Sequence, residues 1–146
     1  MATKADIDAI YRLLCEGDVE RPEGCAPMDP VSTMLWVATV VAQEMTCVAE
    51  IDGEIRGTGA LDMKAWPWNQ NEQFMAESWL FVDPLYRKGK TAVSIIKKML
   101  SIAEKKGGLV FMGSAFGDRT KAKDRLHSMQ GLKYLGGNFT KEFKRI

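Results

Sequence analysis

Residues 82–92 read Val-Asp-Pro-Leu-Tyr-Arg-Lys-Gly-Lys-Thr-Ala, and this stretch decides the fold that we expect for the whole chain. A strand pattern ends at Val82, a tight basic turn follows, and a long helical pattern begins at Thr91. Helix N-termini leave backbone N–H groups unpaired and have a partial positive charge, so such a junction can surround a phosphate group. Gly89, Thr91 and Ala92 are small enough to allow that approach. The stretch therefore predicts an anion site at the start of a helix.

The segment after this turn predicts a helix followed by a strand. Residues 91–106 have apolar residues on one helical face, and Gly107-Gly108 ends the pattern. Residues 109–114 form a short apolar run typical of a buried strand. Because a helix separates this strand from the strand over 74–82, we expect the two strands to pair in parallel as a crossover.

Two helices are predicted before the sheet. The first covers residues 4–16 and begins with a capping-box-like pattern. The second begins with Asp29 as the N-cap and Pro30 at the first helical position. Its expected buried face consists of Val31, Met34, Leu35, Ala38, Val41 and Ala42.

A hairpin is predicted next, because Asp52-Gly53 lies between strand patterns over residues 46–51 and 54–63. Residues 65–72 contain Trp66 and Trp68 and are expected to form an exposed loop, whose indoles could hold a cationic or apolar ligand if the loop overhangs a binding cleft.

A last helix is predicted to begin at Asp118, and a final hairpin over residues 132–135 and 138–144 should follow it. The inner residues of this helix are expected to be Ala122, Leu126 and Met129. The sequence thus predicts a mixed α/β fold.

The composition is that of a single ordinary domain. The chain has 146 residues, 46% of them hydrophobic and 27% charged, with a net charge of +1. Basic clusters are interrupted by acidic residues, so we expect no nucleic-acid partner. The three cysteines show neither zinc-site nor disulfide spacing, and there is no apolar run long enough to span a membrane, so a cytoplasmic, metal-free protein without a membrane partner is expected.

The tripeptide Gly89-Lys90-Thr91 is similar to the end of a P-loop, but that motif requires a glycine where this chain has Pro84. Proline has no N–H for a phosphate, which argues against a nucleotide triphosphatase.

The pattern Val-x-Pro-x-Tyr-Arg, followed by a glycine-containing turn and an amphipathic helix, resembles the acetyl-CoA motif of the GNAT superfamily of N-acetyltransferases. Arg87 and Ala92 match the ends of the family's turn motif, whereas Lys90 stands at its usual glycine position and Gly89 lies one residue early. The resemblance covers nearly the whole chain. It implies a mostly antiparallel sheet of six to seven strands with a central parallel β-α-β crossover and helices on both faces. The first of these strands is nearly absent here, because only residues 1–3 precede the first helix.

The resemblance also implies a site. The expected cofactor-binding positions are Leu80 and Val82 on the strand, and in the turn and helix Arg87, Lys88, Gly89, Lys90, Thr91 and Ala92. No metal is implied.

Two catalytic candidates follow from the same resemblance. Glu77 is the only carboxylate on the motif strand, although the usual position of the base falls at Ala76, so the assignment of Glu77 needs a bulge or a different working geometry. The only histidine, His127, stands where the family commonly has the tyrosine that protonates the leaving thiolate. The alternatives are a solvated strand residue and a helix-end histidine satisfied by a carbonyl group.

We therefore expect residues 1–146 to be one acyl-CoA N-acyltransferase domain that transfers an acetyl group from acetyl-CoA to a primary amine of a small molecule or protein. The alternative is a catalytically silent module of the same fold that binds CoA or a partner protein. An exposed final hairpin could also pair across a homodimer interface.

Overall fold

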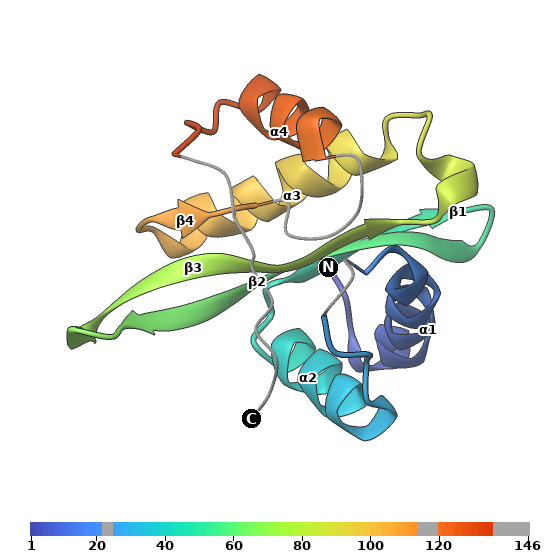
Figure 1. Ribbon diagram of the computed structural model, residues 1–146, viewed down its shortest axis with the longest axis horizontal. Helices are drawn as coiled ribbons and strands as arrows, with labels where there is room; N and C mark the ends of the chain where they lie inside the picture. The colour runs from blue at the N-terminus through green and yellow to red at the C-terminus, as the bar shows by residue number, and fades with distance from the viewer. Residues whose placement is uncertain (22–24, 114–119, 136–146) are drawn as a thin grey trace, which may run out of the picture.

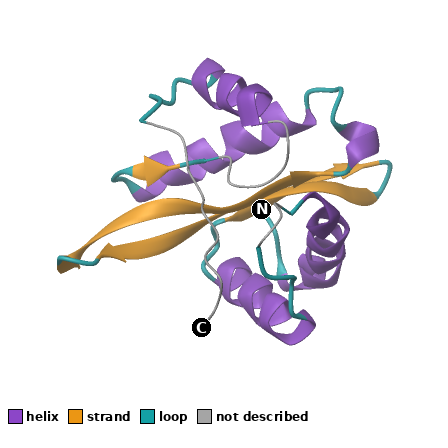
Figure 2. Cartoon of the chain, viewed as in Figure 1, coloured by secondary structure: helices purple, strands orange, loops and turns teal. Residues whose placement is uncertain are grey.

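The computed structural model describes residues 1–21, 25–113 and 120–135. A single sheet lies in the middle, with helices α1 and α2 on one face and α3 and α4 on the other (Figure 1). Figure 2 shows the same chain by secondary structure. The elements are η1 (Lys4–Asp6), α1 (Ile7–Gly17), η2 (Asp18–Glu20), α2 (Pro30–Ala42), β1 (Thr46–Ile51), β2 (Glu54–Trp66), β3 (Asn69–Val82), η3 (Pro84–Tyr86), α3 (Thr91–Lys106), β4 (Val110–Phe111) and α4 (Thr120–Met129).

The described part of the sheet has four strands in the order β1-β2-β3-β4. The first three are antiparallel, and β4 pairs with β3 in parallel after α3, which confirms the predicted crossover pairing. Six to seven strands were expected. The first of them is reduced to one backbone hydrogen bond from Ala2 N to Thr46 O at 2.9 Å. Residues 132–135 form no strand, and the rest of the expected final hairpin lies outside the described residues.

The β1–β2 hairpin is confirmed. Asp52 and Gly53 both have positive φ angles, 53° and 79°, as a two-residue turn of this type requires.

The next connection differs from the prediction, because no long loop covers residues 65–72. Strand β2 continues to Trp66, β3 begins at Asn69, and Pro67 and Trp68 alone lie between the two strands. The Trp66 ring contacts the rings of Phe74 and Phe111 at centroid distances of 4.4 and 6.0 Å. These aromatic contacts help to stabilise the pairing of β2 with β3 up to Trp66. The hairpin projects away from the helices (Figure 1).

One core lies between the sheet and α3. Its buried residues include Leu61 and Met75 from the strands, and Ile95, Met99 and Ile102 from the helix. The helix lies very close to β2 at Gly59. A Cβ added there would lie only 2.5 Å from both Ile95 Cγ2 and Met99 Sδ.

A second core lies on the other face, under α1 and α2, and includes Ile10, Val37 and Trp79. The N-cap prediction for α2 is confirmed, since Asp29 Oδ2 accepts a hydrogen bond from Ser32 N at 2.7 Å. The predicted buried face of α2 was largely wrong. The buried residues are Thr33, Val37, Val40 and Val41, whereas Val31, Leu35 and Ala42 are exposed. Because apolar residues surround this helix, their spacing does not indicate which face is buried.

Candidate functional site

A bulge in β3 sets the direction of its site-facing side chains. Ala60 pairs with Trp79 and the next residue, Leu61, pairs with Glu77, so Ser78 is an extra residue on β3. The bulge reverses the alternation, so that Glu77 faces the same side as its partner Leu61 and as Leu80, the side covered by α3. This is the bulge that a site role for Glu77 requires.

Strands β3 and β4 pair only at Met75–Val110 and Ala76–Phe111. From Glu77 onward, β3 has no strand partner on its β4 side among the described residues. A cavity of about 340 Å³ lies here, lined by residues of α1, η2, the segment before α2, α2 itself, β3, the segment after β4 and α4.

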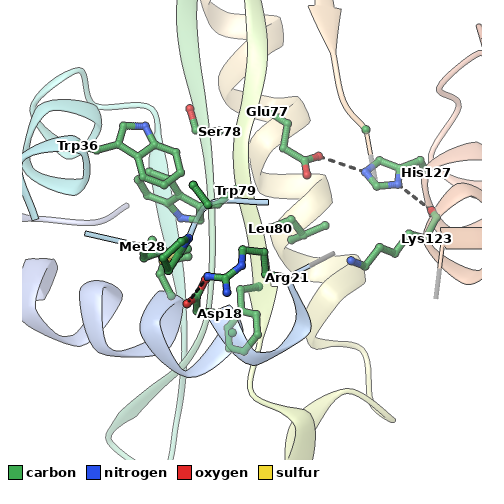
Figure 3. A pocket seen from close by; sticks show the side chains of 16 residues that line it. Asp18, Arg21, Met28, Trp36, Glu77, Ser78, Trp79, Leu80, Lys123 and His127 are labelled. Carbon is green, nitrogen blue, oxygen red and sulfur yellow. Dashed lines mark hydrogen bonds and ion pairs between the residues drawn. The ribbon is translucent and has the colours of Figure 1, made fainter. Parts of the chain in front are cut away.

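His127 of α4 and Glu77 of β3 meet in this cavity. His127 Nε2 lies 3.3 Å from Glu77 Oε2, and the two side chains are only 9% and 12% exposed (Figure 3). The other ring nitrogen, Nδ1, lies 2.7 Å from the backbone carbonyl of Lys123. Since a carbonyl oxygen only accepts, Nδ1 carries a proton. The remaining nitrogen faces an acceptor-only carboxylate, so a second proton is needed to form this hydrogen bond.

The pKa of His127 is raised above 6.5, mainly because of the hydrogen bond to Glu77, with further contributions from the Lys123 carbonyl and from Asp124, while burial opposes the shift. The contact with Glu77 therefore favours the imidazolium form of His127 more than in a free histidine. The burial of His127 also corrects the predicted inner face of α4, because Ala122 and Met129 are exposed and Leu126 is only half-buried.

The basic turn is held by Asp83, which is 7% exposed. Its Oδ1 accepts a hydrogen bond from Leu85 N at 3.0 Å, and its Oδ2 lies 3.2 Å from Arg56 Nη1. The Arg56 guanidinium also lies 5.1 Å from the centre of the Tyr86 ring. These contacts fix η3, and through it the path of the chain from β3 to α3.

The N-terminus of α3 follows this turn. Its N-cap, Lys90, makes no side-chain capping bond, and Lys88 and Gly89 are exposed beside it. The described residues therefore leave the first backbone N–H groups of the helix, at Thr91 and Ala92, without a side-chain acceptor from the N-cap. Such an end suits an anion.

Arg87 is turned away from this helix end. Its Nε donates to the backbone carbonyl of Val82 at 2.8 Å, its Nη1 lies 2.6 Å from Glu20 Oε1, and its guanidinium lies 5.2 Å from the centre of the Phe81 ring.

Of the two predicted strand positions, Leu80 lines the cavity, whereas Val82 is buried in the core.

The sequence analysis missed the side of the cavity that faces α1 and α2. Asp18 and Arg21 form an ion pair at 2.8 Å there, and Trp36 packs edge-on against Trp79 with ring centroids 4.9 Å apart. The i, i+3 spacing of the charged pair was the one available signal. Trp66 and Trp68 are absent from the cavity lining, because the hairpin carries them away from it.

Within the described ranges, no three His, Cys, Asp or Glu side chains are grouped so that they could hold a metal ion. None of the helices described is long and apolar enough to cross a membrane.

No family model and no curated protein matches the sequence. Solved structures do match the fold. An N-acetyltransferase from Staphylococcus aureus Mu50 has a TM-score of 0.73 and 20% identity, over 92% of this chain and 82% of that one. A predicted acetyltransferase with acetyl-CoA from Clostridium acetobutylicum has a TM-score of 0.72 and 15% identity, over 97% of this chain and 92% of that one. A ribosomal-protein-alanine N-acetyltransferase from Brucella melitensis has a TM-score of 0.70 and 19% identity, over 92% of this chain and 83% of that one. The chain therefore has the fold of the GNAT acetyltransferases.

Proposed function

We propose that residues 1–146 act as a single N-acyltransferase domain that transfers an acetyl group from acetyl-CoA directly to a primary amine. The main support is the contact between His127 and Glu77 in the cavity beside β3, because it places a proton donor and a carboxylate together.

Acetyl-CoA fits the charges and the shape of the basic turn. The pyrophosphate is assigned to the backbone N–H groups of Thr91 and Ala92, with Lys88 and Lys90 supplying positive charge and Gly89 leaving room. A Cβ added at Gly89 would have only Tyr86 O nearby, at 4.0 Å, so this side of the turn is open. The edge of β3 that includes Leu80 and Val82, which has no strand partner on the β4 side among the described residues, is assigned to the pantetheine arm. We assign Arg87 to holding the turn rather than to a phosphate, because its guanidinium already binds Val82 O and Glu20.

Acetyl-CoA supplies the activated acetyl group. The reaction forms a C–N bond and breaks the thioester C–S bond, and the nitrogen loses two protons in going from ammonium to amide. Glu77 uses its carboxylate to accept a proton from the ammonium group, directly or through water, and passes it to solvent. The Nε2–H of His127 is the proton donor for the leaving sulfur, and the proton lost from the nitrogen as the amide forms restores the imidazolium. Lys123 orients the imidazole through its carbonyl oxygen.

The experiment that tests this function is thiol release from acetyl-CoA over a panel of primary amines. The matched variants are Glu77→Gln and His127→Asn, which remove the titrating groups with little change in size, and Lys97→Glu, an exposed change on the outer face of α3. We expect the first two to lower kcat by roughly 10²- to 10⁴-fold, the usual contribution of a general acid or base, and the third to leave it unchanged. Full activity of Glu77→Gln and His127→Asn would rule out the assigned roles.

The alternative is a silent module of the same fold that binds CoA or a partner protein. Lys90 in the usual glycine position and Ala76 in the usual base position favour it. Calorimetry with CoA and acetyl-CoA separates the two, since binding without turnover on any amine supports the silent module.

A further inference from the structure

Both carboxylates that line the cavity among the described residues, Asp18 and Glu77, face a basic side chain. Arg21 Nη1 lies 2.9 and 2.8 Å from the two carboxylate oxygens of Asp18, and Glu77 faces His127. Lys123 also takes part in interactions, through its carbonyl with His127 and beyond it. The described lining therefore presents no isolated carboxylate for a second ammonium group.

The side of the cavity that faces α1 and α2 has, besides the Asp18–Arg21 ion pair, an apolar surface formed by Met28, Trp36 and Trp79. Trp79 is 6% exposed, and its only polar group, Nε1–H, donates to Thr58 Oγ1 at 3.1 Å, so the ring offers only carbon surface to the cavity. Trp36 packs edge-on against Trp79, and Met28 also lines this side of the cavity (Figure 3). Flat rings and a thioether favour an apolar, and especially an aromatic, ligand.

Glu77 and this apolar surface lie on opposite sides of β3. The bulge at Ser78 directs Glu77 toward α4, while Trp79 faces α1 and α2, and both side chains line the same cavity. A ligand whose amine reaches Glu77 can therefore extend its body past the strand toward Trp36 (Figure 3). The volume of about 340 Å³ is near the lower end of the roughly 300–1,000 Å³ typical of ligand pockets.

We propose that the acceptor is a primary monoamine on an uncharged aromatic body, an aralkylamine, and that Trp36 selects it. This inference rests on the proposed acetyl transfer. A polyamine would bring a second ammonium group, for which the described lining residues offer no isolated carboxylate, and burying an unpaired charge is costly. An uncharged ring has no such desolvation cost, and its apolar surface is buried against the indoles of Trp36 and Trp79.

The test compares amines that differ in charge. Acetyl transfer is measured for tryptamine and 2-phenylethylamine, and for spermidine. We expect kcat/KM for the two monoamines to exceed that of spermidine at least tenfold, about 1.4 kcal/mol. Trp36→Ala should raise the KM for tryptamine, whereas Trp68→Ala, which removes an indole that is 78% exposed and outside the cavity, should not.

The outcomes separate this inference from the proposed function. If spermidine is acetylated as well as the monoamines, the acceptor assignment is wrong and the acetyltransferase stands. If acetyl-CoA gives no turnover on any amine, the function fails, and calorimetry of tryptamine and spermidine against the protein still decides the selectivity of the cavity. Tryptamine binding that is lost in Trp36→Ala and kept in Trp68→Ala supports the inference, and equal or stronger binding of spermidine, or no binding of tryptamine, overturns it.

Discussion

The Nε2 atom of His127 lies 3.3 Å from Oε2 of Glu77, although the two residues are 50 positions apart in the chain. Neither side chain could make this contact if β3 ran without its bulge, because Glu77 would then point to the opposite face of the sheet. The pair is the feature on which the assigned proton transfers depend.

The first prediction concerns the titration of His127, the only histidine in the chain. Its pKa is raised mainly by the hydrogen bond to Glu77, so Glu77→Gln should lower the imidazole pKa toward 6.5. The measurement is an NMR titration of the single imidazole in both proteins. An unchanged pKa in the variant would show that the pair does not form in solution.

The same pair predicts how stability depends on pH. Since the folded-state pKa of His127 is raised, its contribution is fully present below the unfolded value of 6.5 and is lost as the pH rises through the folded value. The difference in free energy of unfolding between wild type and His127→Gln should therefore be larger at about pH 6 than at about pH 9, and removing the partner of the buried carboxylate should cost about 1–3 kcal/mol. Urea unfolding at the two pH values tests this, and a difference independent of pH would contradict it.

The basic turn predicts how affinity for CoA responds to charge. Lys88→Glu should weaken CoA binding by roughly tenfold or more, because a charge-assisted contact contributes about 1.5–3 kcal/mol, and the loss should shrink at high salt. Lys97→Glu makes the same charge change on the outer face of α3 and serves as the control. Calorimetry with CoA at two salt concentrations is the measurement. If the two variants lose the same amount of CoA affinity, the loss comes from the change in net charge and not from a contact in the turn.

The ion pair between Arg87 and Glu20 predicts a different effect. It joins the turn after β3 to η2, next to the cavity residues Asp18 and Phe81. Glu20→Gln and Arg87→Met should both raise the KM for the amine while changing CoA affinity less than Lys88→Glu does, and their effects should not be additive. A double-mutant cycle on KM and on CoA affinity tests this. If Arg87→Met abolishes CoA binding and Glu20→Gln does not, Arg87 binds the cofactor directly.

Close packing of α3 on β2 predicts a loss of stability in Gly59→Ala. The new Cβ would lie 2.5 Å from Ile95 Cγ2 and Met99 Sδ, and overpacking of this kind costs about 1–3 kcal/mol. Gly89→Ala is the control for folding, because its Cβ would meet nothing closer than 4.0 Å. The free energy of unfolding of both variants is measured with urea. If Gly59→Ala is as stable as Gly89→Ala, α3 moves away from β2 without a cost in stability.

The sequence by itself determined the local elements whose signals lie within a few residues. The Asp29 N-cap, the Asp52-Gly53 turn and the helix from Thr91 to Lys106 lie where capping, turn chemistry and apolar spacing predict them. The parallel pairing of β3 with β4 also follows, since a helix joins them.

Tertiary structure alone decided the rest. The face that α2 buries, the extent of the β2–β3 hairpin and the bulge at Ser78 depend on contacts between residues distant in the chain, and an evenly apolar helix or a continuous strand pattern has no local signal for them. The meeting of Glu77 with His127, and of Trp36 with Trp79, follows from those contacts, because the direction of a side chain on a strand depends on register and not on residue type.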